Sequence, residues 1–203
     1  APPGYRPTDI LKEAKNVVVV GLELLRAVVD TTPSREFAIH YDTANQLLNQ
    51  LAYQVALYLS RRGYRAVPIP ASKPADLKAF RGDLSHKHAA VEAGMGEFGR
   101  NNLLLTPQFG PRVRLVSLVT DAPLESGSRR EIGLCRPDRC DSACWKICPP
   151  QAFFPEEPRN DKQKCFGYRG QKGEELGYDF ACALCMKVCP APGALHRTKE
   201  GIV

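Results

Sequence analysis

The sequence predicts a mixed α/β region over residues 1–124, followed by a cysteine-rich region over residues 125–203. Three observations support this division. Apolar residues in the first region follow strand and helix patterns in turn. All eight cysteines lie between positions 135 and 189. Between the two regions, from Asp121 to Arg130, proline, serine, glycine and charged residues accumulate, as is typical of a linker.

The α/β region is expected to begin with a short helix, capped by Thr8, that runs to Lys15. The β-branched run at 17–20 suits a buried strand. Apolar residues then recur at three- and four-residue steps over 36–62, which predicts a long amphipathic helix ended by Gly63. The remaining predicted elements are a strand at 64–69, a short helix at 85–93 and a strand at 112–120.

The composition is that of an ordinary globular protein, with 43% hydrophobic and 25% charged residues. No run approaches the roughly eighteen consecutive apolar residues of a membrane-spanning helix, so no membrane span is expected. No signal peptide is visible at the first residues. The formal net charge is +6, but the basic residues are dispersed along the chain. A nucleic-acid partner is therefore not expected.

The cysteine-rich region contains an internal repeat. The segments Cys144–Pro149 and Cys185–Pro190 both read cysteine, apolar, lysine, apolar, cysteine, proline. A bacterial two-cluster ferredoxin uses two runs of the form C-x₂-C-x₂-C-x₃-C-P, in which the fourth cysteine of each run ligates the other cluster. The repeat therefore predicts a ferredoxin-type domain with two [4Fe–4S] clusters.

Eight cysteines are the number that two such clusters require. The run before Pro190 has Asp179 where its first cysteine should stand, and Cys165 is expected to supply the missing thiolate. The run before Pro149 has wider spacings and needs a bulged loop. The predicted ligands are Cys135, Cys140, Cys144 and Cys189 for the first cluster, and Cys148, Cys165, Cys182 and Cys185 for the second.

Three other interpretations of the cysteines stay open. Structural zinc prefers paired C-x₂-C knuckles and leaves the repeated Cys-Pro unexplained. Four disulfides suit a small secreted scaffold, whereas the first 134 residues here lack cysteine and resemble a normal core. Asp179 is an alternative ligand to Cys165. Cluster ligation in a reducing cytoplasm explains most of the pattern.

The segment Gly94–Gly99 matches G-x-G-x-x-G, a fingerprint of dinucleotide-binding folds. That fingerprint follows a strand and opens a helix. The residues before it here, 85–92, are predicted to be helical, so a dinucleotide site is not expected.

The segment from Ala93 to Pro107, with its continuation to Leu124, resembles the junction of the corrinoid-binding and ferredoxin domains in epoxyqueuosine reductases and reductive dehalogenases. The placing of Cys165, with sixteen residues between it and Cys182, is also similar to theirs. In those families a nitroreductase-like α/β domain holds cobalamin with its lower base detached. The resemblance therefore implies a nitroreductase-like domain, a bacterial-type 2[4Fe–4S] ferredoxin domain and a corrinoid-linked reductase.

The resemblance also suggests candidate site residues. Glycine at positions 94, 96 and 99 would let the backbone approach a corrin, although a tight turn from helix to strand explains the same residues. Tyr41 is a candidate catalytic proton donor, although its place on the apolar stripe also suits the core. His86 and His88 are expected to face solvent. The candidate cofactor-binding residues are Gly94, Gly96, Gly99, Arg100, Asn101 and Arg112.

By this resemblance, one cluster receives electrons from an external ferredoxin or flavodoxin-like donor. The other passes them to a corrinoid, for reduction of a small molecule or activation of a corrinoid protein. Only fourteen residues follow Cys189, where epoxyqueuosine reductases continue into a helical-repeat region, so a tRNA substrate is not expected. The alternative is a non-catalytic electron-transfer protein whose α/β region docks partners.

Overall fold

The computed structural model describes residues 1–72, 81–154 and 159–191 and shows a mixed α/β protein. Its residues group into two compact units, each assembled from segments that are distant in sequence. The first unit comprises Ala1–Leu22, Tyr41–Gly94 and Arg114–Arg129, and the second comprises Glu23–His40, Met95–Val113 and the chain from Arg130 onward. The boundary predicted at residues 124–125 lies inside the third segment of the first unit.

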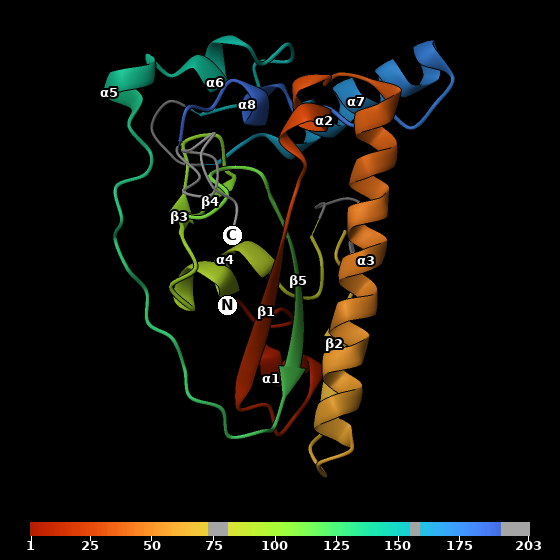
Figure 1. Ribbon diagram of the computed structural model, residues 1–203, viewed down its shortest axis with the longest axis vertical. Helices are drawn as coiled ribbons and strands as arrows, with labels where there is room; N and C mark the ends of the chain where they lie inside the picture. Colours follow the sequence, from red (N-terminus) through yellow and green to blue (C-terminus); the bar gives the residue numbers. More distant parts are fainter. Residues whose placement is uncertain (73–80, 155–158, 192–203) are drawn as a thin grey trace, which may run out of the picture. The chain divides into compact units, whose positions relative to one another are not determined.

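A three-stranded sheet forms the centre of the first unit (Figure 1). Its order is β1 (Asn16–Glu23), β5 (Val113–Thr120) and β2 (Ala66–Ile69), which confirms the three predicted strands. The β2 and β5 strands are antiparallel, with Ala66 opposite Thr120. Seven of the eight β5 residues are buried because this strand is central. The β1 strand is only half-buried, contrary to the prediction, because it lies at the edge of the sheet.

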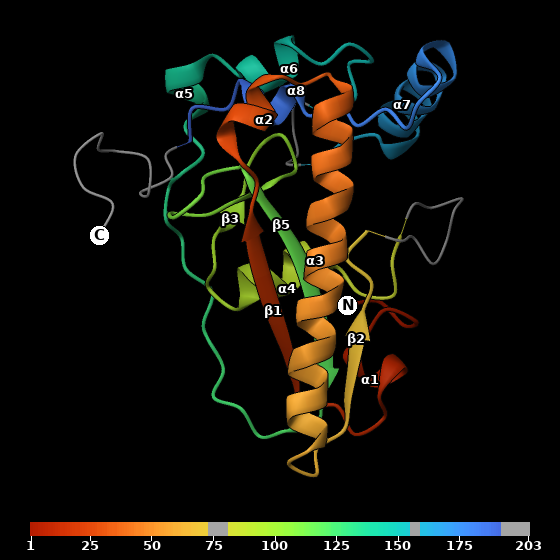
Figure 2. The ribbon, with the colours of Figure 1, turned by 45° about the vertical axis from the view of Figure 1, so that its right-hand side comes forward.

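Helix α3 (Arg35–Ser60) is the longest element and confirms the helix predicted at 36–62. From Tyr41 onward it runs alongside the sheet of the first unit (Figure 2). Its buried Leu48 and Leu59 pack in clusters with Val116 and Leu118 of β5. Each such burial stabilises the fold by about 1.5–3 kcal/mol. Gly63 follows the helix with φ of +85°, a conformation that glycine adopts without strain.

Two short helices complete the first unit. The α4 helix (His86–Glu92) begins at Ser85, whose hydroxyl accepts a hydrogen bond from the His88 amide, and this confirms the helix predicted at 85–93. The α1 helix (Pro7–Ile10) is shorter than the predicted helix at 8–15, because the chain becomes extended at Leu11. The buried Leu11 side chain instead packs in a cluster with Ile69 and Val119 of the sheet.

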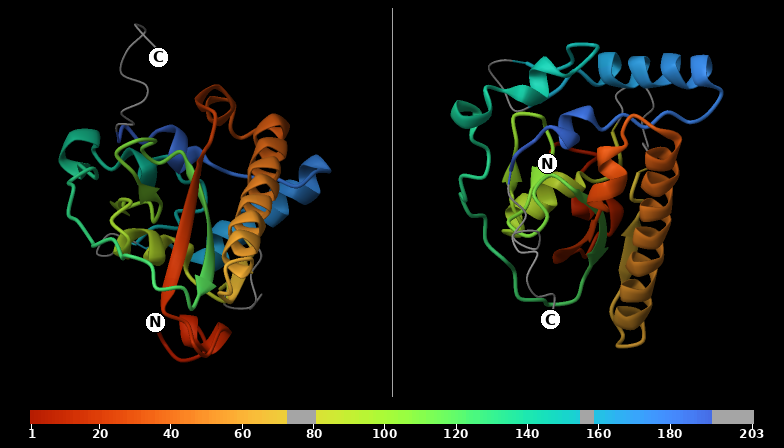
Figure 3. Two further views of the ribbon diagram at one scale, coloured as in Figure 1. Left: turned by 60° about the horizontal axis from the view of Figure 1, so that its bottom comes forward. Right: turned by 45° about the horizontal axis from the view of Figure 1, so that its top comes forward.

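The second unit holds all the cysteines, on helices and on the loops that join them. The α6 and α8 helices contain the first cysteines of the two repeat copies, and they pack against each other. Helix α2 also contacts α8. Figure 3 shows the cysteine-bearing helices in teal and blue. The elements are α2 (Arg26–Asp30), β3 (Glu97–Phe98), β4 (Leu104–Leu105), α5 (Pro137–Cys140), α6 (Ala143–Lys146), α7 (Lys162–Leu176) and α8 (Leu184–Lys187).

The two repeat copies therefore take the same local structure. Each forms a four-residue helix that begins one residue before its first cysteine, and each helix is followed by the second cysteine and the proline. Over the described ranges, no helix combines the length and the apolar character needed to cross a bilayer.

Candidate functional site

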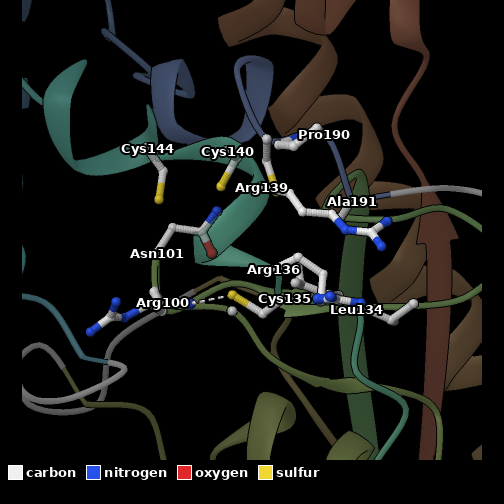
Figure 4. Close-up of a pocket in the computed structure, with 13 residues that line it drawn as sticks. Arg100, Asn101, Leu134, Cys135, Arg136, Arg139, Cys140, Cys144, Pro190 and Ala191 are labelled. Carbon is white, nitrogen blue, oxygen red and sulfur yellow. Dashed lines mark hydrogen bonds between the residues drawn. The ribbon is translucent and has the colours of Figure 1, made fainter. Parts of the chain in front are cut away.

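Four cysteines line one cavity of about 300 Å³ in the second unit (Figure 4). Three of them come from α5, α6 and the loop before α5, and the fourth follows α8. The cavity has about ten times the roughly 30 Å³ that one water molecule occupies in the liquid, which is more space than a single metal ion fills. The four are Cys135, Cys140, Cys144 and Cys189, the set proposed from the sequence for the first cluster.

The other four cysteines include thiols that lie close enough to raise one another's pKa. Burial raises the pKa of Cys185, the nearby Cys182, Cys165 and Cys148 thiols raise it further, and Cys144 of the first set adds a smaller contribution. Burial likewise raises the pKa of Cys165, with further contributions from Cys182 and Cys148. These four residues are the set proposed from the sequence for the second cluster.

Without a nearby cation, several of these thiols have a raised pKa and resist deprotonation. Burial raises the pKa of Cys144 to about 11, and the neighbouring Cys189, Cys140 and Cys135 add to the effect. Four thiolates around one cavity repel one another unless positive charge lies among them. Iron supplies such charge and binds thiolate sulfur, so this donor set fits an iron–sulfur cluster.

Two structural observations concern the disulfide and zinc interpretations of the cysteines. All eight cysteines lie in the described part of the chain, and none forms a disulfide. Within the described ranges, no three histidine, cysteine, aspartate or glutamate side chains are placed to hold one metal ion. Asp179, the alternative ligand to Cys165, is exposed.

Glu97 holds the loop that leads to Cys135, a role that the sequence did not reveal. Its carboxylate accepts hydrogen bonds from the backbone amides of Ile132 (3.0 Å), Gly133 (2.8 Å) and Cys135 (2.9 Å). Partial burial opposes ionisation of Glu97, but these hydrogen bonds outweigh it and lower the pKa. Glu97 therefore stays ionised and fixes the position of Cys135.

Arg100 also reaches the first cysteine set. Its backbone amide donates a hydrogen bond to the Cys135 sulfur at 3.4 Å. Its guanidinium lies 4.3 Å from the centre of the Trp145 ring, and the Trp145 indole donates to the Arg100 carbonyl at 3.1 Å. Arg100 is thus attached both to the loop before α5 and to α6. Asn101 lines the same cavity.

The glycines between α4 and β4 have local structural reasons. Gly94 follows α4 with φ of +75°, where a side chain would be strained. A Cβ atom on Gly96 would lie 2.0 Å from the Leu105 carbonyl oxygen, and one on Gly99 would lie 2.6 Å from Asn101 Oδ1. These contacts match the turn interpretation of the glycines, and contact with a corrin stays a prediction.

Tyr41 belongs to the first unit, whereas the cysteine cavity belongs to the second. The Tyr41 hydroxyl lies 3.1 Å from the Ser72 hydroxyl, and the Arg114 guanidinium lies 4.3 Å from the centre of its ring. Arg114 also donates two hydrogen bonds to Asn45 Oδ1, at 3.1 and 2.9 Å. Tyr41 therefore has polar neighbours, and its role as a proton donor stays a prediction.

Arg112, a candidate cofactor-binding residue, stands immediately before β5, and its buried Nε has no hydrogen-bond partner within the described ranges. Contact of Arg112 with a cofactor stays a prediction.

The expectation that His86 faces solvent is wrong. Its ring nitrogens lie 2.9 Å from the Ser117 hydroxyl and 3.0 Å from the Pro70 carbonyl, because the Ser85 cap directs the start of α4 toward the sheet. His88 is exposed, as expected.

No family model matches the chain. A tetrachloroethene reductive dehalogenase of Desulfitobacterium hafniense is 32% identical over an alignment of 206 positions that covers 92% of this chain and 33% of that protein. The epoxyqueuosine reductase of Pseudomonas aeruginosa is 28% identical over an alignment of 218 positions that covers 97% of this chain and 56% of that protein. This chain is a relative of the reductive dehalogenases and epoxyqueuosine reductases. The resemblance seen in the sequence is thereby confirmed.

Solved structures of both families share the fold of this chain. A reductive dehalogenase structure, reported with a mechanism for B12-dependent dehalogenation, matches 86% of this chain with a TM-score of 0.71 at 25% identity. A selenomethionine-labelled epoxyqueuosine reductase matches 91% of this chain with a TM-score of 0.60 at 20% identity. The chain spans 33% of the length of the curated dehalogenase and 25% of the solved one.

Proposed function

We propose that this chain is an oxidoreductase that carries electrons through two [4Fe–4S] clusters, each held by four of its eight cysteines. The observation that supports this most directly is the division of the thiols into two groups of four. One group lines the 300 Å³ cavity, and in the other the Cys148 and Cys182 thiols raise the pKa of both Cys165 and Cys185. Each group combines cysteines from both halves of the repeat, as the crossing of ligands in a bacterial ferredoxin requires.

When bound, the clusters would supply one-electron redox chemistry. The residues of this chain would provide their environment. Glu97 fixes the loop that carries Cys135, and the Arg100 amide donates a hydrogen bond to its sulfur. In the second set, the Ala152 amide donates to the Cys148 sulfur at 3.4 Å. Free thiols suit a reducing compartment, so we place the protein in the cytoplasm.

The electron acceptor in this proposal is a corrinoid with a detached lower base. Support comes from the relationship to reductive dehalogenases, since the solved relative was reported with a mechanism for B12-dependent dehalogenation. The reaction would be reduction of a small molecule or activation of a corrinoid protein. The alternative is an electron-transfer protein without catalysis of its own. That alternative needs only the two sets of thiols.

An acidic ferredoxin or flavodoxin-like protein is the electron donor that we propose. All three charged residues that line the cavity of the first set are arginines: Arg100, Arg136 and Arg139. Arg136 and Arg139 are exposed at its rim. Positive charge around a redox site attracts a negatively charged partner and speeds its association. The first set is therefore the proposed entry point for electrons.

Cobalamin binding distinguishes the two candidate functions. The protein is reconstituted anaerobically with iron and sulfide and then titrated with cobalamin. A corrinoid-linked reductase is expected to change the cobalamin spectrum saturably, with a dissociation constant below about 10 µM, which corresponds to roughly 7 kcal/mol of binding free energy. Absence of any spectral change at a tenfold higher concentration would favour the electron-transfer protein. Bovine serum albumin at equal concentration controls for non-specific changes.

A further inference from the structure

Thr32, in the turn between α2 and α3, hydrogen-bonds the loop that carries Cys182 and Cys185. Its hydroxyl oxygen accepts a hydrogen bond from the Ala183 amide at 3.2 Å, and its carbonyl oxygen accepts one from Lys187 Nζ at 3.2 Å. Figure 1 shows α2 beside α8, the helix that begins directly after Ala183. Thr32 is 1% exposed and Ala183 is 4% exposed, so the bond between them is shielded from water.

Contacts within its own segment fix the turn that carries Thr32. The Thr32 amide donates to the Val29 carbonyl at 3.1 Å, at the end of α2. The Ser34 hydroxyl accepts from the Phe37 amide at 3.1 Å and so caps the start of α3. Phe37 itself is buried. The Thr32 hydroxyl is therefore held in place as an acceptor by the fold of this segment.

The two copies of the cysteine repeat differ in this contact. Lys187 and Lys146 occupy the same position in their copies. Lys187 donates to the Thr32 carbonyl, whereas Lys146 forms an ion pair with Asp141 in which both side chains are exposed. The turn between α2 and α3 thus holds the second copy through a lysine whose counterpart in the first copy lies at the surface. Lys146 offers a matched control.

We propose that Thr32 is a positioning residue for the second cluster and acts through the Ala183 amide. Ala183 directly follows Cys182 and stands two residues before Cys185. Because the segment between the two cysteines is so short, fixing its amide restricts where both sulfurs can lie. Groups that hold metal ligands in place typically contribute about tenfold to a hundredfold to metal affinity. This inference rests on the proposed function, in which Cys182 and Cys185 are ligands of the second cluster.

Thr32→Val tests the contact, because valine keeps the branched shape of threonine and removes the hydroxyl. The buried Ala183 amide then loses its acceptor. The full chain is reconstituted anaerobically with iron and sulfide, and the release of its iron to an excess of a colorimetric chelator is followed with time. We expect about half of the iron to leave roughly tenfold to a hundredfold faster than from the wild-type protein, and the other half to leave at the wild-type rate.

Control variants separate the hydroxyl from a general loss of packing. Thr32→Ser keeps the acceptor and should restore the wild-type rate. Lys187→Met removes the other bond to Thr32 and should accelerate release of the same half of the iron by about threefold, whereas Lys146→Met should change nothing. In a Cys165→Ala background, where only the first cluster is expected, Thr32→Val should leave the release of the remaining iron unchanged.

Hydrogen–deuterium exchange of the reconstituted chain adds a readout at the contact itself. The Ala183 amide should exchange faster in Thr32→Val than in the wild-type protein or in Thr32→Ser. Iron release at the wild-type rate from Thr32→Val, equal acceleration for both halves of the iron, or the same acceleration in Thr32→Ser would overturn the inference and leave the proposed function intact. Wild-type protein that takes up no iron would overturn both.

Discussion

Cys165→Ala is expected to halve the iron content of the reconstituted protein, from about eight iron atoms per chain to about four. The reason is that the Cys182 and Cys148 thiols lie close enough to Cys165 to raise its pKa, and Cys165 is the only residue of its set on α7. Loss of one ligand opens the second cluster to solvent and to dissociation. The measurement is iron and acid-labile sulfide per chain after anaerobic reconstitution and desalting.

Asp179→Ala is the matched control, because Asp179 stands where the regular ferredoxin pattern has a cysteine. The side chain is exposed, and we expect its removal to leave all the iron in place. The iron retained by Cys165→Ala shows at the same time that this variant has folded. Full iron in Cys165→Ala together with a loss in Asp179→Ala would reverse the ligand assignment.

Glu97→Ala is expected to have the second largest effect. It removes the carboxylate that accepts hydrogen bonds from three backbone amides in the loop before α5, and alanine offers no acceptor in its place. Hydrogen bonds to a charged acceptor contribute about 1.5–3 kcal/mol each when buried. Because Glu97 is partly exposed, we expect a total loss of about 2–4 kcal/mol in the free energy of unfolding, measured by denaturant titration of the cluster-free protein.

The same variant should lose iron mainly from the first cluster, because the loop that Glu97 holds carries Cys135. Glu92→Ala is the control, since Glu92 is an exposed glutamate whose ion pair with Arg129 lies at the surface. Glu97→Gln keeps one carbonyl oxygen and should fall between the two. Equal stability and iron content in Glu97→Ala and Glu92→Ala would show that the loop is held by other contacts.

Local patterns in the sequence were sufficient to predict much of the fold. The apolar periodicity of 36–62 predicts α3, and the alternation of strands and helices predicts β1, β2, α4 and β5. These elements follow from side-chain spacing within one segment. The helix predicted to end at Lys15 was too long, since Leu11 packs against the sheet and the chain turns there.

Contacts between distant segments were not predictable in the same way. Glu97 and Cys135 are far apart in the sequence. Because the donors to Glu97 are backbone amides, the contact does not depend on the side chains of the loop and cannot be recognised from its residue types. The partners of Thr32 in the cysteine loop are equally non-local. That Cys135, Cys140, Cys144 and Cys189 lie around one cavity could be predicted, because the ferredoxin pattern restricts which cysteines are expected to share a cluster.

The account depends above all on iron and sulfide being bound by the eight cysteines. The most direct measurement is elemental analysis with Mössbauer spectroscopy of protein purified and kept without oxygen. We predict about eight iron atoms and eight sulfides per chain, with the Mössbauer parameters of [4Fe–4S] clusters and a broad absorption band near ~400 nm. Colourless protein that contains zinc in place of iron, or in which the thiols are paired as disulfides, would contradict the account.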